Sequence, residues 1–329
     1  MTRRALPPLR FEPIFKENLW GGRRLPGLLR RPAPTANPIG EAWVLSDVDG
    51  SPSRVADGPH AGTTLRDLLA ADPAAILGGA ELVNGRFPLL LKFIDARQEL
   101  SVQVHPDDAR AAAAYPGASG KTEAWYVLDA NPETSRIYAG FRPGVSAGEF
   151  RAALAAKTTP RTLHSYTPTP GDCVFLEAGT VHAIGADILM FEVQQTCDIT
   201  YRLYDWDRVD AKTGKPRELH VEQGLACADF ARGPCPPVTP VRVGSRERLV
   251  GCPYFTFDRY TGSDSFRVGT AGACRVVVCA SGAGELECGS ARLPLAVGDV
   301  VLIPASADEA QCHPAGGITL LECGVGPAN

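Results

Sequence analysis

The chain is organised around three pieces of sequence: SVQVHPDD (residues 101–108), GKTEAWYVL (120–128) and GDCVFLEAGTVHAIG (171–185). In the first piece, Val102 and Val104 alternate with Gln103 and His105. Side chains two residues apart on a strand point to the same face, so Gln103 and His105 project together, about 7 Å apart along the strand. The pattern predicts a strand whose polar face carries two potential metal ligands.

The other two pieces add a carboxylate and a second imidazole. TEAWYVL is rich in aromatic and β-branched residues and predicts a strand that begins near Glu123. GDCVFL predicts another strand, and the AGT turn after it leaves His182 at the mouth of the next one. A lone histidine on a strand is more often structural than a ligand, but the joint order of Gln-x-His, Glu and Gly-Thr-x-His is typical of a metal site in a β-barrel. Two imidazoles, a carboxylate and an amide oxygen suit Zn²⁺, with Mn²⁺, Fe²⁺ or Co²⁺ as alternatives.

A fourth piece, FEVQQTCDITYRLYDWDR (191–208), supplies the carboxylate of Glu192 and the guanidinium of Arg202. Upstream, Lys92 interrupts the apolar strand FPLLLKFI (87–94). A lysine left uncompensated in an apolar interior costs several kcal/mol. We therefore expect Lys92 to reach a cavity or a counter-ion, for which a phosphate group is a natural candidate.

Long motifs of this chain carry a family resemblance. They are PIFKENLWGG (13–22), IGEAWVLSD (39–47), FPLLLKFIDARQELSVQVHPDD (87–108), GKTEAWYVL, GDCVFLEAGTVHAIG, TYRLYDWDR (200–208) and RELH (217–220). Together the motifs resemble the short bacterial form of type I phosphomannose isomerase (mannose-6-phosphate isomerase), a metal-dependent enzyme family of the cupin superfamily. The resemblance implies that the zinc ligands are Gln103, His105, Glu123 and His182. It implies that Arg202 is the active-site arginine. It also implies that the substrate pocket is lined by Lys92, Ser101, Lys121 and Glu192.

The implied reaction is the interconversion of mannose 6-phosphate and fructose 6-phosphate through an enediol or enediolate. It needs a group that polarises the oxygens, a general base and a site for the phosphate. Arg202 is too basic to act as the base and suits oxyanion stabilisation or sugar orientation. The candidate bases are Glu192, Lys121 and Lys92, with a plain salt bridge to Arg202 as the other interpretation of Glu192. Lys121 lies two residues before Glu123 and should share its face.

Two other functions compete with the isomerase. One is a cupin oxygenase using Fe²⁺, which the glutamine and the four-ligand count disfavour, because such enzymes keep open positions for O₂. The other is a sugar-binding or regulatory cupin without catalysis, which predicts the loss of Arg202 or of a metal ligand. All five of these residues are present.

The composition is that of an ordinary globular protein. The chain has 329 residues, 44% hydrophobic and 21% charged, with a formal net charge of -4, which argues against a nucleic-acid partner. No stretch approaches the roughly 18 to 20 apolar residues that cross a bilayer, and we expect no membrane partner and a cytoplasmic location. The ten cysteines form no CxxC pair and are predicted to stay reduced. The expected partner is a small sugar phosphate, and the oligomeric state is unknown.

The pattern predicts a mainly β protein with two cupin-type, jelly-roll-like barrels and a few short helices. We expect a catalytic metal-binding domain with short helical segments over residues 1–230, a proline-rich linker over 231–240 and a second cupin-like barrel over 241–329. GDVVLIPASADE (298–309) repeats GDCVFLEAGTVH (171–182) without gaps. The second copy has glutamate where the first has histidine, so the second barrel should lack a metal site. Its strands are expected to be 5 to 9 residues long.

Helices are predicted over residues 63–79 (one or two), 107–114, 146–157 and 217–230. Thr63 or Thr64 is the expected N-cap of the first, and Gly78 ends it. Ser146 and Glu149 form a capping box for the third. The fourth is expected to close the first module.

Overall fold

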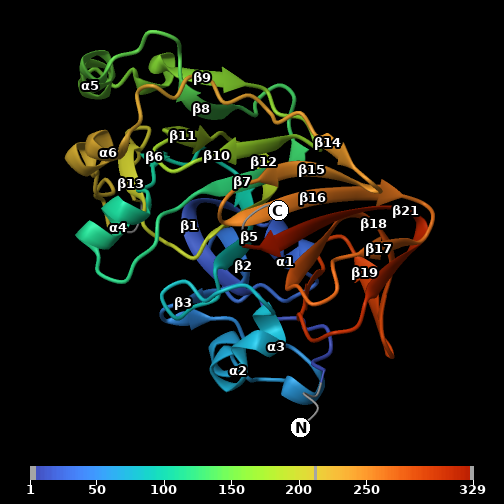
Figure 1. Cartoon of the computed structure of the whole chain (residues 1–329). Coiled ribbons are helices and arrows are strands. Elements are labelled where there is room, and N and C mark those ends of the chain that lie inside the picture. Colours follow the sequence, from blue (N-terminus) through green and yellow to red (C-terminus); the bar gives the residue numbers. More distant parts are fainter. Residues whose placement is uncertain (1–4, 211–212, 327–329) are drawn as a thin grey trace.

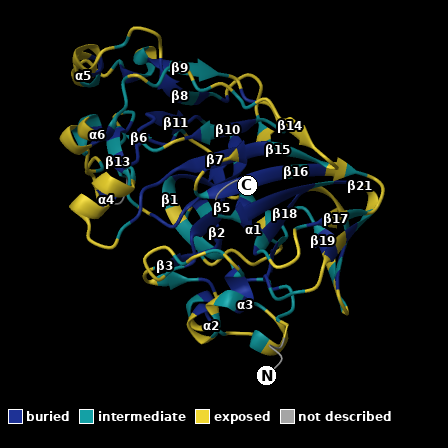
Figure 2. Ribbon diagram, viewed as in Figure 1, coloured by how far each residue is buried: buried dark blue, intermediate teal, exposed yellow. Residues whose placement is uncertain are grey.

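The computed structural model describes residues 5–210 and 213–326 and has the predicted mainly β architecture. Three large antiparallel sheets form the body of the structure, and short helices lie around them (Figure 1). The inner strands are buried, whereas the helices expose one side to solvent (Figure 2). Side chains on the inner strands are therefore held by the packing around them.

A six-stranded sheet and a five-stranded sheet build the first half. In spatial order, the six-stranded sheet contains β1 (Ile14–Gly22), β2 (Ile39–Leu45), β5 (Leu89–Ala96), β12 (Ile188–Gln195), β7 (Glu123–Ala130) and β10 (Cys173–Leu176). The five-stranded sheet contains β13 (Tyr201–Tyr204), β6 (Val102–Val104), β11 (His182–Ile184), β8 (Ile137–Phe141) and β9 (Leu163–Tyr166). One hydrophobic cluster takes residues from both sheets, among them Trp125 and Ile184, so the two sheets pack face to face.

The alternation of side chains on β12 decides what faces the space between these sheets. Met190 belongs to the cluster between the sheets, and Glu192 points to the same side. Phe191 and Val193 point to the opposite face and join a different cluster. The apolar outer face packs on the rest of the protein, while the inner face can carry charged groups.

The third sheet lies entirely after residue 240. It contains β14 (Val241–Val243), β15 (Arg246–Gly251), β16 (Phe255–Gly262), β17 (Phe266–Val268), β18 (Arg275–Cys288), β19 (Ala291–Ala296), β20 (Val300–Ile303) and β21 (Ala310–Val325). The predicted lengths of 5 to 9 residues are wrong for several strands, since β18 has 14 residues and β21 has 16. Irregularities in register between Cys279 and Ser281 and between Gly282 and Gly284 bend the pair, so each long strand pairs with several partners.

The internal repeat is visible in the hydrogen bonds of its two turns. Gly171 and Gly298 have φ angles of 97° and 92°, a conformation that favours glycine. The following aspartates, Asp172 and Asp299, each accept a hydrogen bond at 2.8 Å from the backbone N–H three residues earlier. Each turn then leads into a short strand, β10 or β20. The two halves thus share a local structure as well as a sequence pattern.

The two halves also share a hydrophobic core. The ring of Phe257 in β16 lies 6.1 Å from that of Phe191 and 6.5 Å from that of Tyr126, measured between centroids. Residues 232–240 form neither helix nor strand, as expected of a linker. The boundaries at 230 and 240 stay a prediction, and the shared core indicates that neither half is closed by itself.

Short helices and one small hairpin complete the fold. They are α1 (Arg24–Leu28), α2 (Leu65–Ala71), α3 (Pro73–Leu77), α4 (Asp108–Ala114), α5 (Ala147–Ala155), α6 (Val221–Cys227), the 3₁₀ turns Gly58–His60 and Thr159–Thr162, and the hairpin β3 (Asp47–Val48) and β4 (Ser51–Pro52). Thr64 is the N-cap of α2, and Gly78, at φ 66°, ends α3. The capping box of Ser146 and Glu149 is present in α5. The helix predicted over 217–230 is confined to α6, because residues 217–219 are not helical and His220 is the N-cap.

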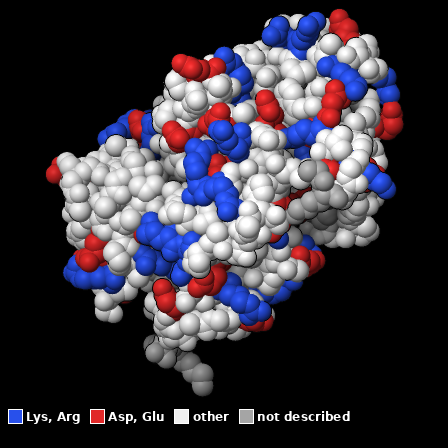
Figure 3. Space-filling model, turned by 180° about the vertical axis from the view of Figure 1, so that it is seen from behind, with Lys and Arg blue, Asp and Glu red and all other residues white. Residues whose placement is uncertain are grey.

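The surface mixes charges of both signs. On the face shown in Figure 3, groups of basic and acidic side chains are interspersed. In the described part of the chain, no helix is both long and apolar enough to cross a membrane.

Candidate metal centre

Strand pairing brings the predicted ligands together from both sheets. His182, the first residue of β11, is directly opposite Gln103 of β6. His105 follows β6 immediately, and Glu123 begins β7 in the facing sheet. One donor atom from each of His105, Glu123 and His182 lies within 4.8 Å of the others. All three side chains are buried.

The donor atoms converge on one point. His182 Nε2 lies 3.2 Å from Glu123 Oε1, and His105 Nε2 lies 3.6 Å from Glu123 Oε2. The amide Nε2 of Gln103 lies 3.3 Å from His182 Nε2 and 3.5 Å from His105 Nε2. Turning this amide by 180° would present Oε1, the ligand atom, to the same point. Gln103 is therefore placed as the sequence predicted, at the edge of the three-residue cluster.

Backbone carbonyls fix the tautomer of both histidines. His105 Nδ1 lies 2.9 Å from the carbonyl oxygen of Ile199, and His182 Nδ1 lies 2.9 Å from that of Thr180. A carbonyl oxygen can only accept, so each Nδ1 carries the proton and donates it. The lone pair of each Nε2 then points into the centre, the arrangement usual for metal-binding histidines.

Burial keeps both imidazoles neutral. Together with the positive charge of Lys121, it lowers the pKa of His182 to about 4 and that of His105 well below its usual value. Both oxygens of Glu123 are buried and accept no hydrogen bond of regular geometry in the described structure. Neutral imidazoles beside a buried carboxylate are the donor set that a divalent cation requires. The residues fit a metal ion, without specifying which one.

Lys121 places a positive charge at the centre. Its Nζ lies 2.9 Å from Glu123 Oε2 and 3.0 Å from His105 Nε2, and it shares the face of Glu123 as predicted. Burial alone would lower the pKa of this ammonium, but the carboxylates of Glu123 and Glu192 raise it above its usual value. Lys121 is therefore protonated at neutral pH.

A cavity of about 300 Å³ opens beside the metal centre. The residues that line it are Asn18, Trp20, Glu41, Lys92, Ile94, Leu100, Ser101, Gln103, Lys121, Trp125, Ile184, Glu192, Asp198, Thr200, Arg202 and Arg217. The predicted pocket residues Lys92, Ser101, Lys121 and Glu192 are all among them, together with Arg202. Gln103 lines the cavity as well and links it to the centre.

The cavity contains a buried charge cluster. The sequence predicted two of its members, Lys92 and Glu192, but not Glu41. Lys92 Nζ lies 3.4 Å from Glu192 Oε1 and 3.5 Å from Glu41 Oε2. Burial would lower the pKa of Lys92, but these two carboxylates raise it. Glu192 pairs with Lys92, and at 3.8 Å with Lys121, rather than with Arg202, whose Nη1 donates to the carbonyl oxygen of Glu218. Burial raises the pKa of Glu192, and the neighbouring Lys92 partly offsets this.

Sequence reasoning missed three charged residues of the cavity: Glu41, Asp198 and Arg217. Glu41 and Trp43 lie two residues apart on the same face of β2. A glutamate at that position of a strand rich in apolar residues could have indicated a pocket residue. Arg217 Nε donates to Asp205 Oδ2 at 2.8 Å, a contact over 12 residues that no local pattern indicates.

Arg202 and Arg217 bring two guanidinium groups to the cavity. Arg202 Nη1 donates to the carbonyl oxygen of Glu218 at 2.8 Å, which holds its side chain. Burial lowers the pKa of Arg202, and the positive charge of Arg217 contributes in the same direction. Burial and a nearby cation both disfavour the protonated guanidinium. An anionic ligand there would be attracted by both groups.

The fold and the site define a class of protein: a metal-binding cupin whose cavity combines carboxylates with cationic side chains. A family model described as the catalytic domain of type I phosphomannose isomerase matches residues 9–139. The mannose-6-phosphate isomerase ManA of Bacillus subtilis is 33% identical over 305 residues, which cover 90% of this chain and 93% of that protein. The mannose-6-phosphate isomerase of Streptococcus mutans is 33% identical over 300 residues, or 89% and 92% of the two chains.

A solved structure agrees. The crystal structure of mannose 6-phosphate isomerase from Bacillus subtilis has a TM-score of 0.86 with 30% identity and covers 96% of this chain and 99% of that one. Phosphomannose isomerase from Salmonella typhimurium, at 17% identity and a TM-score of 0.77, has the same fold. The chain belongs to the type I phosphomannose isomerase family.

Proposed function

We propose that this protein is a metal-dependent aldose-ketose isomerase that interconverts mannose 6-phosphate and fructose 6-phosphate. The proposal rests mainly on one observation: the cluster of His105, Glu123 and His182 lies beside a cavity lined by carboxylates and cationic side chains. Isomerisation needs a polarising centre, a base and an anion site within the reach of one small sugar phosphate. Relatives with similarity over nine-tenths of the chain carry the name of this activity.

The proposed metal ligands are Gln103, His105, Glu123 and His182. A divalent cation held there would act as a Lewis acid toward the sugar oxygens. The two imidazoles and the carboxylate suit zinc, with manganese, iron or cobalt as alternatives. Metal analysis of the purified protein identifies the ion.

We infer that Glu192 is the general base. Its carboxylate is buried and its pKa is raised, which brings it toward the operating pH that an efficient base requires. Lys92 and Lys121 have raised pKa values and so carry their protons, which disfavours them as bases. Their role in this proposal is to hold Glu192 in place and to stabilise negative charge on the substrate oxygens.

The phosphate is expected to bind near Arg202 and Arg217. Lys92 already lies between two carboxylates, whereas these guanidinium groups line the cavity wall and match phosphate geometry. Ser101, whose hydroxyl lies 3.4 Å from Gln103 Oε1, is placed to hold a sugar hydroxyl. Arg202 can also stabilise oxyanion charge that develops during proton transfer.

Reaction in D₂O separates this proposal from a cupin that only binds sugars. An enediol intermediate exchanges its transferred proton with solvent, at least in part, so product isolated at early times should carry deuterium at C1 or C2. Incorporation read by NMR supports proton transfer through an enediol. Absence of turnover with metal-loaded protein would leave the non-catalytic function, and consumption of O₂ would favour an oxygenase. The cytoplasmic location stays a prediction, which cell fractionation tests.

A further inference from the structure

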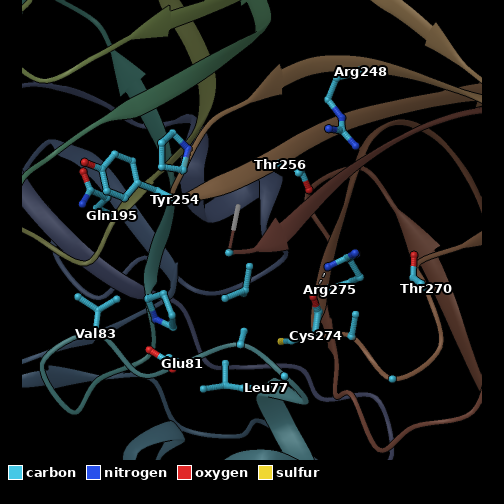
Figure 4. Close-up of a pocket in the computed structure, with 18 of the residues that line it drawn as sticks. Leu77, Glu81, Val83, Gln195, Arg248, Tyr254, Thr256, Thr270, Cys274 and Arg275 are labelled. Atoms are coloured by element: carbon cyan, nitrogen blue, oxygen red, sulfur yellow. Dashed lines mark hydrogen bonds between the residues drawn. The ribbon is translucent and has the colours of Figure 1, made fainter. Parts of the chain in front are cut away.

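A second cavity of the described structure is larger than the one beside the metal centre. It has a volume of about 850 Å³ and lies between the chain after α3 and the C-terminal sheet. Arg248 and Arg275 lie on one side of it, and Gln195 and Val83 lie across from them (Figure 4). This volume is within the range of small-molecule binding sites.

Two arginines of the cavity share one buried carboxylate. Arg248 Nε donates to Asp258 Oδ1, and its Nη2 lies 3.4 Å from Oδ2. Arg246 Nε lies 3.2 Å from Asp258 Oδ2. Asp258 is 1% exposed, whereas the two arginine side chains are 20% and 25% exposed. Two positive charges are thus held in place by one negative charge, and both reach the cavity.

Arg275 is the third cation, and a glycine makes room for it. Its Nε lies 3.2 Å from Glu322 Oε1, a carboxylate that also accepts hydrogen bonds from Tyr260 and from the N–H of Gly269. A Cβ at Gly324 would lie 2.9 Å from Arg275 Nη1, so a side chain there would displace the guanidinium. Three guanidinium groups therefore face two buried carboxylates on this side of the cavity.

These charged residues occupy the strand positions that build the metal centre in the first half. Val127 and Cys279 donate from their N–H groups to the aspartate carbonyls of the two Gly-Asp turns, which aligns β7 with β18. Four residues before them, β7 carries Glu123 and β18 carries Arg275. The second half thus has a cation where the first has a metal ligand.

The strands next to β18 in the second half can be aligned in the same way with the strands next to β7 in the first half. Glu322 pairs with Asp258 across the strands as Glu192 pairs with Lys92, and Arg248 pairs with Asp258 as Trp43 pairs with Lys92. A register irregularity follows Trp43 and Arg248 alike. The corresponding residues are Glu322 and Glu192, Asp258 and Lys92, Arg248 and Trp43, and Arg246 and Glu41. Both halves keep a charged cluster at one position of the fold, and in the second three arginines outnumber the two carboxylates.

The rest of the cavity wall is largely uncharged. Leu77, Val83, Tyr254 and Val325 contribute apolar or aromatic surface. The one acidic residue among the lining residues is Glu81, which is exposed and lies away from Arg248 and Arg275 (Figure 4). A ligand that fills this space has an anionic group at the arginines and a less polar body against the opposite wall.

We propose that this cavity is a second binding site, separate from the metal centre, for a small organic phosphate. Guanidinium groups bind phosphate with paired hydrogen bonds, and Arg246, Arg248 and Arg275 present three of them from fixed positions. The buried carboxylates behind them orient the guanidinium groups before a ligand arrives, so little conformational entropy is lost on binding. The ligand would be a phosphate monoester with an aromatic or apolar body.

Isothermal titration of the zinc-loaded protein with phenyl phosphate tests the proposal. The informative variant is Arg246→Gln, because Asp258 keeps its contact with Arg248 and the fold keeps that buried pair. The matched control is Arg292→Gln, an exposed arginine of the same sheet that pairs with Glu285 and does not line the cavity. We expect Arg246→Gln to weaken binding about tenfold or more and the control to leave it unchanged. Absence of binding, or equal affinity in all three proteins, would overturn the proposal.

Hydrogen exchange of the wild-type protein gives a test that needs no variant. With phenyl phosphate bound, amides of residues 246–251 and 270–275 should exchange more slowly. Protection confined to residues 101–105 and 200–204 would place the ligand in the catalytic cavity and refute a second site.

Discussion

Lys92 shows how this protein stabilises a charge within a hydrophobic strand. The residue is 4% exposed, and its ammonium lies between the carboxylates of Glu41 and Glu192. A buried ion without partners would cost several kcal/mol, so the three groups depend on one another. The cluster holds the proposed base between two ammonium groups, Lys92 and Lys121.

Replacing Lys92 by methionine should lower the free energy of unfolding by about 3 kcal/mol, because two buried carboxylates lose their shared partner. Urea denaturation at pH 7 measures the change. Lys215→Met is the matched control, since Lys215 is exposed, and its effect should stay within about 0.5 kcal/mol. A Lys92→Met protein as stable as the wild type would show that the two buried carboxylates do not depend on Lys92.

Asp205 links stability to pH. Burial alone would raise the pKa of its carboxyl group, but hydrogen bonds from Arg217 and Arg208 lower it below the ordinary value of 3.8. A lowered folded-state pKa means that the ionised group stabilises the fold above that ordinary value, and that this contribution disappears as pH falls through the folded-state pKa. Asp205→Asn should therefore be less stable than the wild type at pH 7, and the difference should narrow below about pH 3.8. Denaturant titrations at several pH values measure it, and a difference that stays constant with pH would contradict this account.

Site residues could be predicted from the sequence where they belong to a short local motif. Gln103 lies on β6 and His105 follows that strand directly, and Glu123 and His182 each begin a strand that could be recognised. Glu41 lies on a strand that could be recognised, but its ion pair with Lys92, 51 residues away in the chain and on an adjacent strand, could not be predicted. Pairing of distant strands is set by the whole sheet and leaves no local signal.

At the scale of the elements, helix ends were predictable and strand lengths were not. The N-cap of α2 is Thr64, whose side chain accepts a hydrogen bond from the N–H of Asp67 at 3.0 Å. A cap depends on a few adjacent residues. The lengths of β18 and β21 depend on bulges and on several partner strands, so the glycines within them looked like turns.

The cap at Thr64 can be tested against its neighbour. Thr64→Ala should lower the free energy of unfolding by about 1 kcal/mol, because the N–H of Asp67 loses its acceptor. Thr63→Ala is the control, since Thr63 precedes the cap and should change stability little. Thermal denaturation followed by circular dichroism measures both. Equal effects of the two substitutions would show that the cap contributes nothing specific.

At the scale of the whole molecule, the hydrophobic core joins both halves. Phe257 is fully buried in the C-terminal sheet and contacts the outer face of the six-stranded sheet. All four tryptophans lie before residue 210, so their fluorescence reports on the first half alone. The chain thus contains a probe in one half and a core residue to remove from the other.

Phe257→Ala should destabilise the protein by about 3 to 5 kcal/mol through the cavity it leaves. Because the core is shared, tryptophan fluorescence and far-ultraviolet circular dichroism should report one common transition, shifted equally to lower denaturant. Two separate transitions, with the fluorescence change unaffected, would show that the halves fold independently and would support the predicted domain boundaries.

The central claim is that the metal centre carries out the isomerisation. Its most direct test is the conversion of mannose 6-phosphate to fructose 6-phosphate by untreated, EDTA-stripped and zinc-restored protein, beside His182→Ala and the control His164→Ala, a histidine outside the site. The account predicts activity that disappears on stripping, returns with zinc, survives in His164→Ala and is absent in His182→Ala. Full activity in the stripped protein or in folded His182→Ala would contradict it.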